Sequence, residues 1–132
     1  MTSPSAEIPQ VFRLNVEVGD LATAARLYAD LFSQPARPQP GNRIYLTCGP
    51  VMLQVVGMPS PQPLPKALYF TVNDLDAVHA RAKALGIDSN DKVHGQRGGD
   101  INVKPWGERS FYADDPWGNT FCFVEAGTVY AG

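Results

Sequence analysis

The chain has 132 residues, of which 44% are hydrophobic and 18% are charged. This composition provides enough apolar residues for a packed core in one domain, and it excludes an intrinsically disordered chain. The formal net charge of −2 and the lack of any apolar run near the roughly 20 residues that span a bilayer argue against nucleic-acid and membrane partners.

The first predicted elements are a strand and a helix. Residues 11–18 alternate between apolar and polar side chains, the pattern of a strand with one buried face. The polar positions are Arg13, Asn15 and Glu17. Asp20 is suited to cap a helix with an apolar stripe over residues 21–32, and the prolines within residues 35–40 prevent its continuation.

Two more strands, residues 43–48 and 51–56, follow and are joined by Gly49 and Pro50. A further short strand can be formed within residues 35–40. The next segment, residues 58–65, holds four prolines and is predicted to be a linker without helix or strand.

The second half of the chain repeats this order. Residues 66–73 alternate like a strand, and Asp74 opens a second helix that Gly86 closes. Residues 89–100 are polar and rich in glycine, which predicts a mobile loop or a poorly paired ribbon. The last element, residues 109–125, is a β-hairpin around a type I turn with the sequence DPWG.

The two halves share sequence features as well as element order. In each half the strand is followed by a helix through the motif V-x-D-L, at residues 18–21 and again at residues 72–75. Together with DPWGN at residues 115–119 and PWG at residues 105–107, these motifs resemble the vicinal oxygen chelate superfamily of glyoxalases, bleomycin resistance proteins and extradiol dioxygenases. The resemblance covers nearly the whole chain.

The resemblance implies an α+β fold in a single domain. Two tandem βαβββ modules, at about residues 11–57 and 66–126 with the linker 58–65 between them, would form curved mixed sheets around a shared cavity. Two chains usually build the site together in this superfamily. We expect a homodimer, because a curved sheet of two modules exposes apolar edges and the linker 58–65 permits exchange of modules between chains. The superfamily includes lyases, isomerases, oxygenases and proteins that only bind ligands, so the fold does not define the function.

The resemblance also locates the positions that bind metal in the enzymes of the superfamily. In this chain those positions are Arg13, Gln54, Ala67 and Cys122. They do not suit a divalent ion, which needs imidazole or anionic oxygen ligands, because arginine is a permanent cation and alanine has no donor. We therefore expect no metal and no cofactor.

The predicted cavity instead suits an organic ligand that is aromatic or partly anionic. Strand alternation and the family comparison place seven ligand-binding residues on its wall: Arg13, Asn15, Gln54, Tyr69, Thr71, Trp106 and Cys122. Arg13 either contacts the ligand or pairs with Glu17. Trp106 serves as a ligand platform or as a packing anchor, and Cys122 as a reactive thiol or as a small buried side chain.

Three functions are compatible with these residues. The first is a metal-independent protein that binds a small molecule, with drug sequestration as one version. The alternative is a lyase, isomerase or dioxygenase with an atypical active site, in which Glu17 is the one inward carboxylate that could act as a base. The third is a dimeric scaffold. The polar N-terminal residues lack the features of a signal peptide, so we expect a cytoplasmic protein with reduced cysteines.

Overall fold

The computed structural model describes residues 6–132, and these residues form two modules of helices and strands. The first module consists of β1 (Arg13–Val18), α1 (Leu21–Phe32), β2 (Arg37–Gln39), β3 (Arg43–Cys48) and β4 (Val51–Gly57). The second consists of β5 (Leu68–Val72), α2 (Leu75–Ala84), β6 (Lys92–Val93), β7 (Gln96–Arg97), β8 (Asn102–Val103), β9 (Arg109–Asp114) and β10 (Thr120–Glu125). A short 3-10 helix, η1 (Ala126–Thr128), follows β10. The predicted α+β fold with two tandem βαβββ modules is confirmed.

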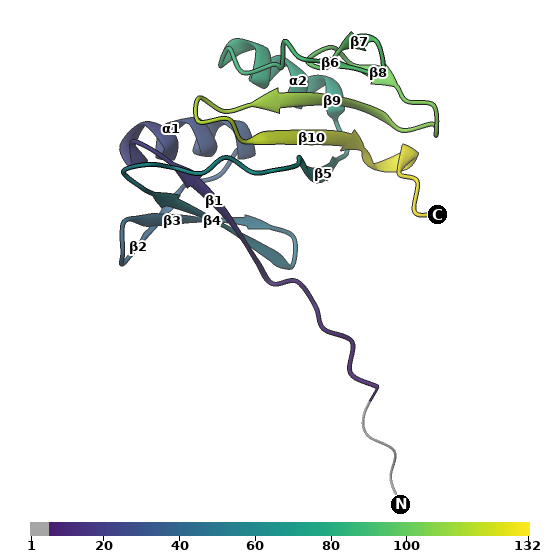
Figure 1. Cartoon of the computed structure of the whole chain (residues 1–132). Helices are drawn as coiled ribbons and strands as arrows, with labels where there is room; N and C mark the ends of the chain where they lie inside the picture. The colour runs from purple at the N-terminus through teal and green to yellow at the C-terminus, as the bar shows by residue number, and fades with distance from the viewer. Residues whose placement is uncertain (1–5) are drawn as a thin grey trace, which may run out of the picture.

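Each module has one mixed sheet of four strands, and the two sheets have the same topology (Figure 1). The first sheet has the order β1-β4-β3-β2 and the second has the order β5-β10-β9-β8. In each sheet the first strand pairs in parallel with the last, and the other pairs are antiparallel. The short strand expected within residues 35–40 is β2. The glycine-rich segment contains β6 and β7, which form a separate two-stranded ribbon.

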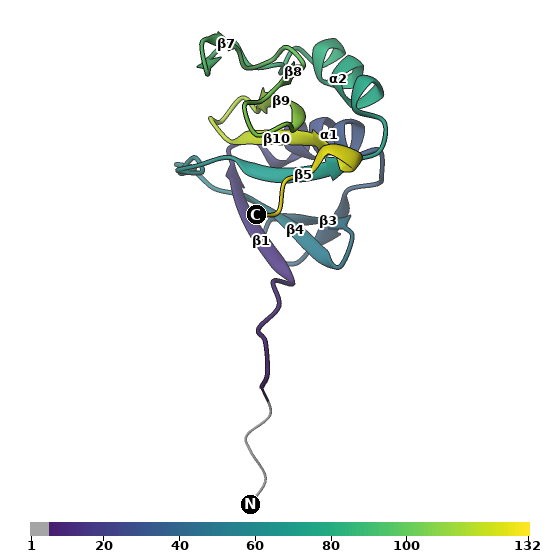
Figure 2. The same cartoon turned by 90° about the vertical axis from the view of Figure 1, so that its right-hand side faces the viewer.

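Both helices lie on one side of the sheets and share a single core with them (Figures 1 and 2). Helix α1 contacts both modules, because the Tyr28 ring lies 5.7 Å from Phe121 and the Phe32 ring lies 5.2 Å from Phe70. Phe70 in turn stacks on Phe123 at 5.6 Å. These contacts make the core continuous between the two halves of the chain.

Buried polar residues of the DPWGN turn join the two modules. The Asp115 carboxylate accepts a hydrogen bond of 2.6 Å from the hydroxyl of Tyr28 on α1. The side-chain amide of Asn119 donates to the Glu17 carbonyl at 2.8 Å and accepts from the Leu64 amide at 3.0 Å. The turn therefore contacts α1, β1 and the linker, three segments that lie far from it in the sequence.

Close packing between the DPWGN turn and the start of α1 explains why residue 19 is a glycine. A Cβ atom added to Gly19 would lie 2.7 Å from Nε1 of Trp117, so the V-G-D-L motif needs glycine at this position. The linker of residues 58–65 contains no helix or strand, as expected.

The two sheets remain separate within the chain and do not close into a barrel. One face of each sheet packs on the helices, while the other face points away from them and carries polar side chains. Residues 6–12 form an extended arm that leaves the body (Figure 1), and its apolar side chains Ile8, Val11 and Phe12 are exposed. No helix among residues 6–132 has the length and apolar character needed to cross a membrane.

Candidate ligand-binding site

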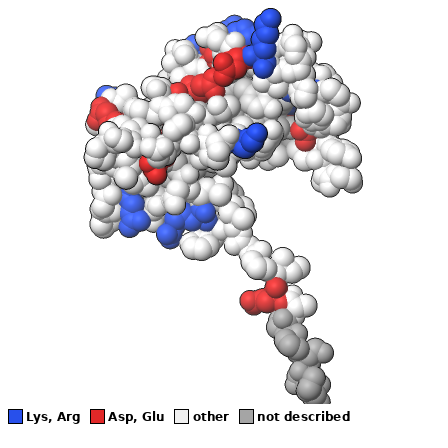
Figure 3. Space-filling view, viewed as in Figure 1, with Lys and Arg blue, Asp and Glu red and all other residues white. Residues whose placement is uncertain are grey.

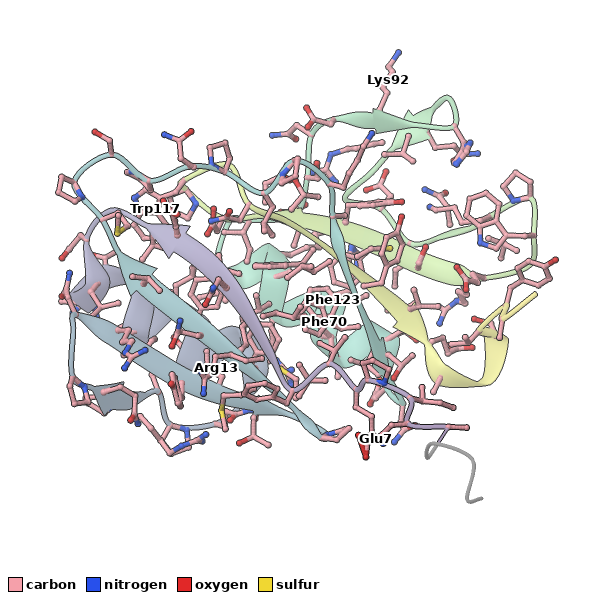
Figure 4. The ribbon with its side chains drawn as sticks, turned by 60° about the horizontal axis from the view of Figure 1, so that its bottom comes forward. Glu7, Arg13, Phe70, Lys92, Trp117 and Phe123 are labelled. Carbon is pink, nitrogen blue, oxygen red and sulfur yellow. The ribbon has the colours of Figure 1, made fainter. Side chains whose placement is uncertain are left out.

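The polar face of the first sheet carries three arginines, Arg13, Arg37 and Arg43, and we call this surface the arginine face. Strand register places them together: Arg37 is opposite Tyr45, and Arg43 and Tyr45 are two residues apart on β3. None of the three forms an ion pair with any residue of the described chain. Figure 3 shows basic side chains gathered over this part of the surface, and Figure 4 shows Arg13 on it. The face therefore carries uncompensated positive charge, although the whole chain is slightly acidic.

Hydrogen bonds and an aromatic ring hold these arginines in place. Arg43 donates to the Gln54 side chain at 2.7 Å and to the Pro40 carbonyl at 2.6 Å, and Gln54 donates to Asn15. The guanidinium carbons of Arg13 and Arg43 lie 5.5 and 5.8 Å from the centre of the Tyr45 ring, within cation–π range. Because these contacts are to neutral groups, the positive charge remains available to an anion.

Arg37 is held in the same way. It donates to the Thr47 hydroxyl at 2.9 Å and contacts the Met52 sulfur at 3.2 Å. Thr47 on β3 is paired with Met52 on β4, and Met52 is paired in turn with Arg13 on β1. Arg37 and Arg13 therefore lie at the same end of the first sheet.

The polar face of the second sheet has a buried thiol at its centre. Cys122 is 1% exposed and is paired with Tyr69 on one side and Tyr112 on the other. The hydroxyls of these two tyrosines are 3.4 Å apart. Burial raises the pKa of the Cys122 thiol, so the thiolate is disfavoured and Cys122 is a poor nucleophile.

A buried lysine lies beside this thiol. Lys104 is 5% exposed, its Nζ has no hydrogen-bond partner among the described residues, and it lies 5.6 Å from the centre of the Tyr112 ring. Burial lowers the pKa of Lys104, because the charged amine loses its hydration.

A cleft of about 420 Å³, which we call the tryptophan cleft, lies over the other end of the second sheet. It is lined by Tyr69, Phe70, Thr71, Trp106, Glu108, Val124, Val129 and Tyr130. Glu108 orders its wall: it accepts a bond from the Trp106 indole at 2.8 Å and another from the Tyr130 amide at 2.9 Å. His94 of the β6–β7 turn packs against Trp106 at 5.2 Å, so the inserted ribbon supports this wall.

Six of the seven residues predicted to bind ligand fall into two groups. Arg13, Asn15 and Gln54 lie on the arginine face, whereas Tyr69, Thr71 and Trp106 line the tryptophan cleft. Cys122 is buried between its strand neighbours Tyr69 and Tyr112 and lines neither surface.

Glu17 does not pair with Arg13. Its carboxylate accepts a hydrogen bond of 2.9 Å from the Gln62 amide of the linker, and no Arg13 ion pair exists among the described residues. This contact ties the end of β1 to the linker.

The four positions that the family resemblance assigns to metal ligands hold groups poorly suited to a divalent ion. Arg13 is a cation, Ala67 has no donor, and both ends of the Gln54 amide are engaged by Arg43 and Asn15. Burial raises the pKa of the Cys122 thiol, which disfavours the thiolate that binds metal. Across residues 6–132, no three His, Cys, Asp or Glu side chains come together in a group that could hold a metal ion.

Several residues of these surfaces were missed from sequence. Arg43 could have been found, because it alternates with Tyr45 and Thr47 on a recognised strand and so shares one face with them. Arg37 depends on the pairing of β2 with β3, and Lys104 reaches Tyr112 across the second sheet. Neither contact has a local sequence signal.

The architecture of two βαβββ modules with polar sheet faces is that of a glyoxalase-type protein, and comparisons with solved structures agree. Two structures described as oxidase ChaP-H2 and oxidase ChaP-H1 are 25% and 24% identical to this chain, with TM-scores of 0.73 and 0.76. The alignments cover 96% and 95% of this chain and 98% and 100% of those chains.

A bleomycin-binding protein complexed with bleomycin is 20% identical with a TM-score of 0.66, over 89% of this chain and 98% of that chain. No protein-family model and no curated protein sequence matches the chain. The chain has the fold of the vicinal oxygen chelate superfamily, which confirms the resemblance seen in its sequence motifs.

Proposed function

We propose that this protein is a metal-independent binder of a small organic molecule, and that its arginine face takes an aromatic or partly anionic ligand. The observation that supports this proposal is that Arg13 and Arg43 both lie within cation–π range of Tyr45, with no acidic partner in the described chain. Guanidinium groups bind carboxylate, sulfonate or phosphate groups in a fixed, two-pronged geometry. Tyr45 adds an aromatic ring beside these guanidinium groups.

The other predicted residues extend this site. Asn15 and Gln54 provide amides beside Arg43, and Tyr69, Thr71 and Trp106 provide rings and a hydroxyl on the second sheet. A protein of the same fold has been solved with bleomycin bound, which supports ligand sequestration as one form of this function.

We further propose that the protein is a homodimer in the cytoplasm. The polar faces of both sheets are open within the described chain, and a second copy would cover part of this surface. The exposed apolar arm around Ile8, Val11 and Phe12 would then be covered by the partner. Light scattering at tens of micromolar should give twice the chain mass, and a monomer would contradict this proposal.

Binding of a matched pair of aromatic probes tests the ligand class. Calorimetric titration with 1-naphthoate and with neutral 1-naphthamide should show binding of the acid and at least about tenfold weaker binding of the amide, because a hydrogen bond to a charged group contributes roughly 1.5–3 kcal/mol. The R13Q and R43Q variants should each weaken naphthoate binding by a similar factor. The control is R26Q, because Arg26 is exposed on α1 on the opposite side of the sheet. Equal affinity for acid and amide, or an unchanged R13Q/R43Q double variant, would reject the arginine face as the site.

A second candidate function is favoured by the similarity to two oxidases that extends over almost the entire chain. In that case the protein is an enzyme with an atypical site, and Glu17 is its candidate base. Once a converted substrate is known, E17Q should abolish turnover while leaving the fold intact by circular dichroism. Unchanged turnover would remove Glu17 from the mechanism.

A further inference from the structure

A second cleft, of about 460 Å³, is lined by residues of both modules, and we call it the inter-module cleft. It lies between the β3–β4 turn of the first module and β5 of the second, and it meets the tryptophan cleft at Tyr69, Phe70 and Thr71. Its volume falls within the roughly 300–1,000 Å³ that small-molecule sites occupy. None of the arginines of the arginine face lines it, so it is a distinct place in the molecule.

The wall of this cleft is mainly apolar. Leu14, Phe32, Phe70 and Phe123 expose parts of the shared core to it, and Figure 4 shows Phe70 and Phe123 side by side at the centre of the molecule. This surface would favour a ligand with a hydrocarbon body, whose burial releases ordered water.

A single cation, Arg81 of α2, stands in this apolar wall. Its Nη2 donates to the Leu31 carbonyl at the end of α1, at 3.0 Å. Its Nε is buried and has no hydrogen-bond partner, and no acidic group of residues 6–132 lies within ion-pair distance. The guanidinium charge of Arg81 is therefore uncompensated within the described chain, and an anionic group in the cleft would neutralise it.

We propose that the inter-module cleft binds an amphiphilic monocarboxylic acid, with its carboxylate on Arg81 and its hydrocarbon body on the aromatic wall. One guanidinium matches one carboxylate in geometry and charge, and the apolar wall disfavours further charges. This site is distinct from the arginine face, because none of the three arginines lines the inter-module cleft, although the cleft shares Tyr69 and Thr71 with the tryptophan cleft.

Decanoate and the uncharged decanol are suitable probes, since they share a chain and differ in charge. Titration of the full chain should show saturable binding of decanoate and at least about tenfold weaker binding of decanol. R81Q should weaken decanoate binding by a similar factor and leave decanol unchanged. R13Q is the matched control: it removes an arginine from the other face and should leave decanoate binding as it is.

Two further measurements locate the probe and guard against unfolding of R81Q. Cys48 lines the cleft and is half-buried, whereas Cys122 is buried, so thiol modification of the native protein reports on Cys48. Decanoate should slow this modification at concentrations that match its dissociation constant. V51W, which places a large side chain on the cleft wall without changing Arg81, should also weaken decanoate binding.

Four results would overturn the proposal. The first two are the absence of saturable decanoate binding and equal affinity for decanoate and decanol. The third is decanoate binding that is lost in R13Q but kept in folded R81Q. The fourth is a Cys48 thiol that cannot be modified because the partner chain of a dimer covers the cleft. Naphthoate binding that is lost in R13Q would still support the proposed function in each of these cases, so the two proposals can fail separately.

Discussion

The hydrogen bond between Tyr28 and Asp115 allows a quantitative test of how the modules are joined. The Tyr28 side chain is completely buried, and its hydroxyl donates to Asp115 Oδ2 at 2.6 Å. The same carboxylate accepts from the Trp117 and Asn119 amides through Oδ1 and from the Asn119 side chain through Oδ2. Burial beside this carboxylate raises the pKa of Tyr28 strongly, so the phenol remains the donor at any ordinary pH.

Y28F removes this donor and little else. A hydrogen bond to a charged group contributes roughly 1.5–3 kcal/mol, and Oδ2 keeps its bond of 2.8 Å from Asn119 in the variant. We therefore expect a loss near the lower limit, about 1.5–2 kcal/mol, which corresponds to a fall in Tm of roughly 5–8 °C for a chain of this size.

Urea denaturation of Y28F, D115N and the double variant measures the interaction directly. The double-mutant cycle should give a coupling energy of about 1–2 kcal/mol, because the two side chains are in contact. The control is Y130F, since the Tyr130 ring is 62% exposed, and its stability should stay within about 0.5 kcal/mol of the parent. A Y28F variant as stable as the parent, or a coupling energy near zero, would refute the view that this bond joins the modules.

Two other substitutions test packing and buried charge. K104M should stabilise the protein by about 1–2 kcal/mol at pH 7, because it replaces a buried amine that has no partner in the described chain. Because the pKa of Lys104 is lowered in the folded state, the unfolded chain binds more protons, and the parent protein gains stability as the pH rises toward 10.5. The stability advantage of K104M over the parent should therefore shrink over that range. An advantage that grows with pH would contradict the assignment of Lys104 as a buried amine with a lowered pKa. G19A should lower the free energy of unfolding by roughly 1–3 kcal/mol, because the added Cβ clashes with Trp117. The control is G127A, which should be neutral because its added Cβ meets nothing within 4 Å. Thermal melts compare the two variants, and equal Tm values would refute the close contact between Gly19 and Trp117.

The secondary structure could be predicted because it depends on local periodicity. The alternation of residues 11–18 and the apolar stripe of residues 21–32 each correspond to an observed element, β1 and α1. The N-cap position of α1 at Asp20 was also predicted, although its side chain accepts a bond from the Thr23 hydroxyl and caps no backbone amide. At α2 the expected cap is present, because Asp74 accepts from the Ala77 amide at 3.1 Å.

The arrangement of the site was harder to predict because it depends on contacts between distant segments. Alternation on β1 was enough to place Arg13 and Asn15 on one face. Their surroundings depend on sheet pairing, which brings Tyr45 and Arg37 beside them, and on the unequal burial of the two polar faces. The unpartnered Nε of Arg81 depends on the packing of α2 near the end of α1, for which a single sequence has no signal.

The joint between the modules has a practical consequence for the polypeptide. The contacts that hold the halves together pair Tyr28 with Asp115, the Glu17 carbonyl with Asn119, and the Gly19 backbone with Trp117, so their partners lie on either side of residues 58–65. The linker adds hydrogen bonds of its own, from the Gln62 amide to Glu17 and from the Leu64 amide to Asn119, and a cut on the N-terminal side of Gln62 leaves both in place. A chain cut within this linker should consequently reassemble from two separate fragments, each carrying one repeat, which would make the protein a natural scaffold for a split reporter.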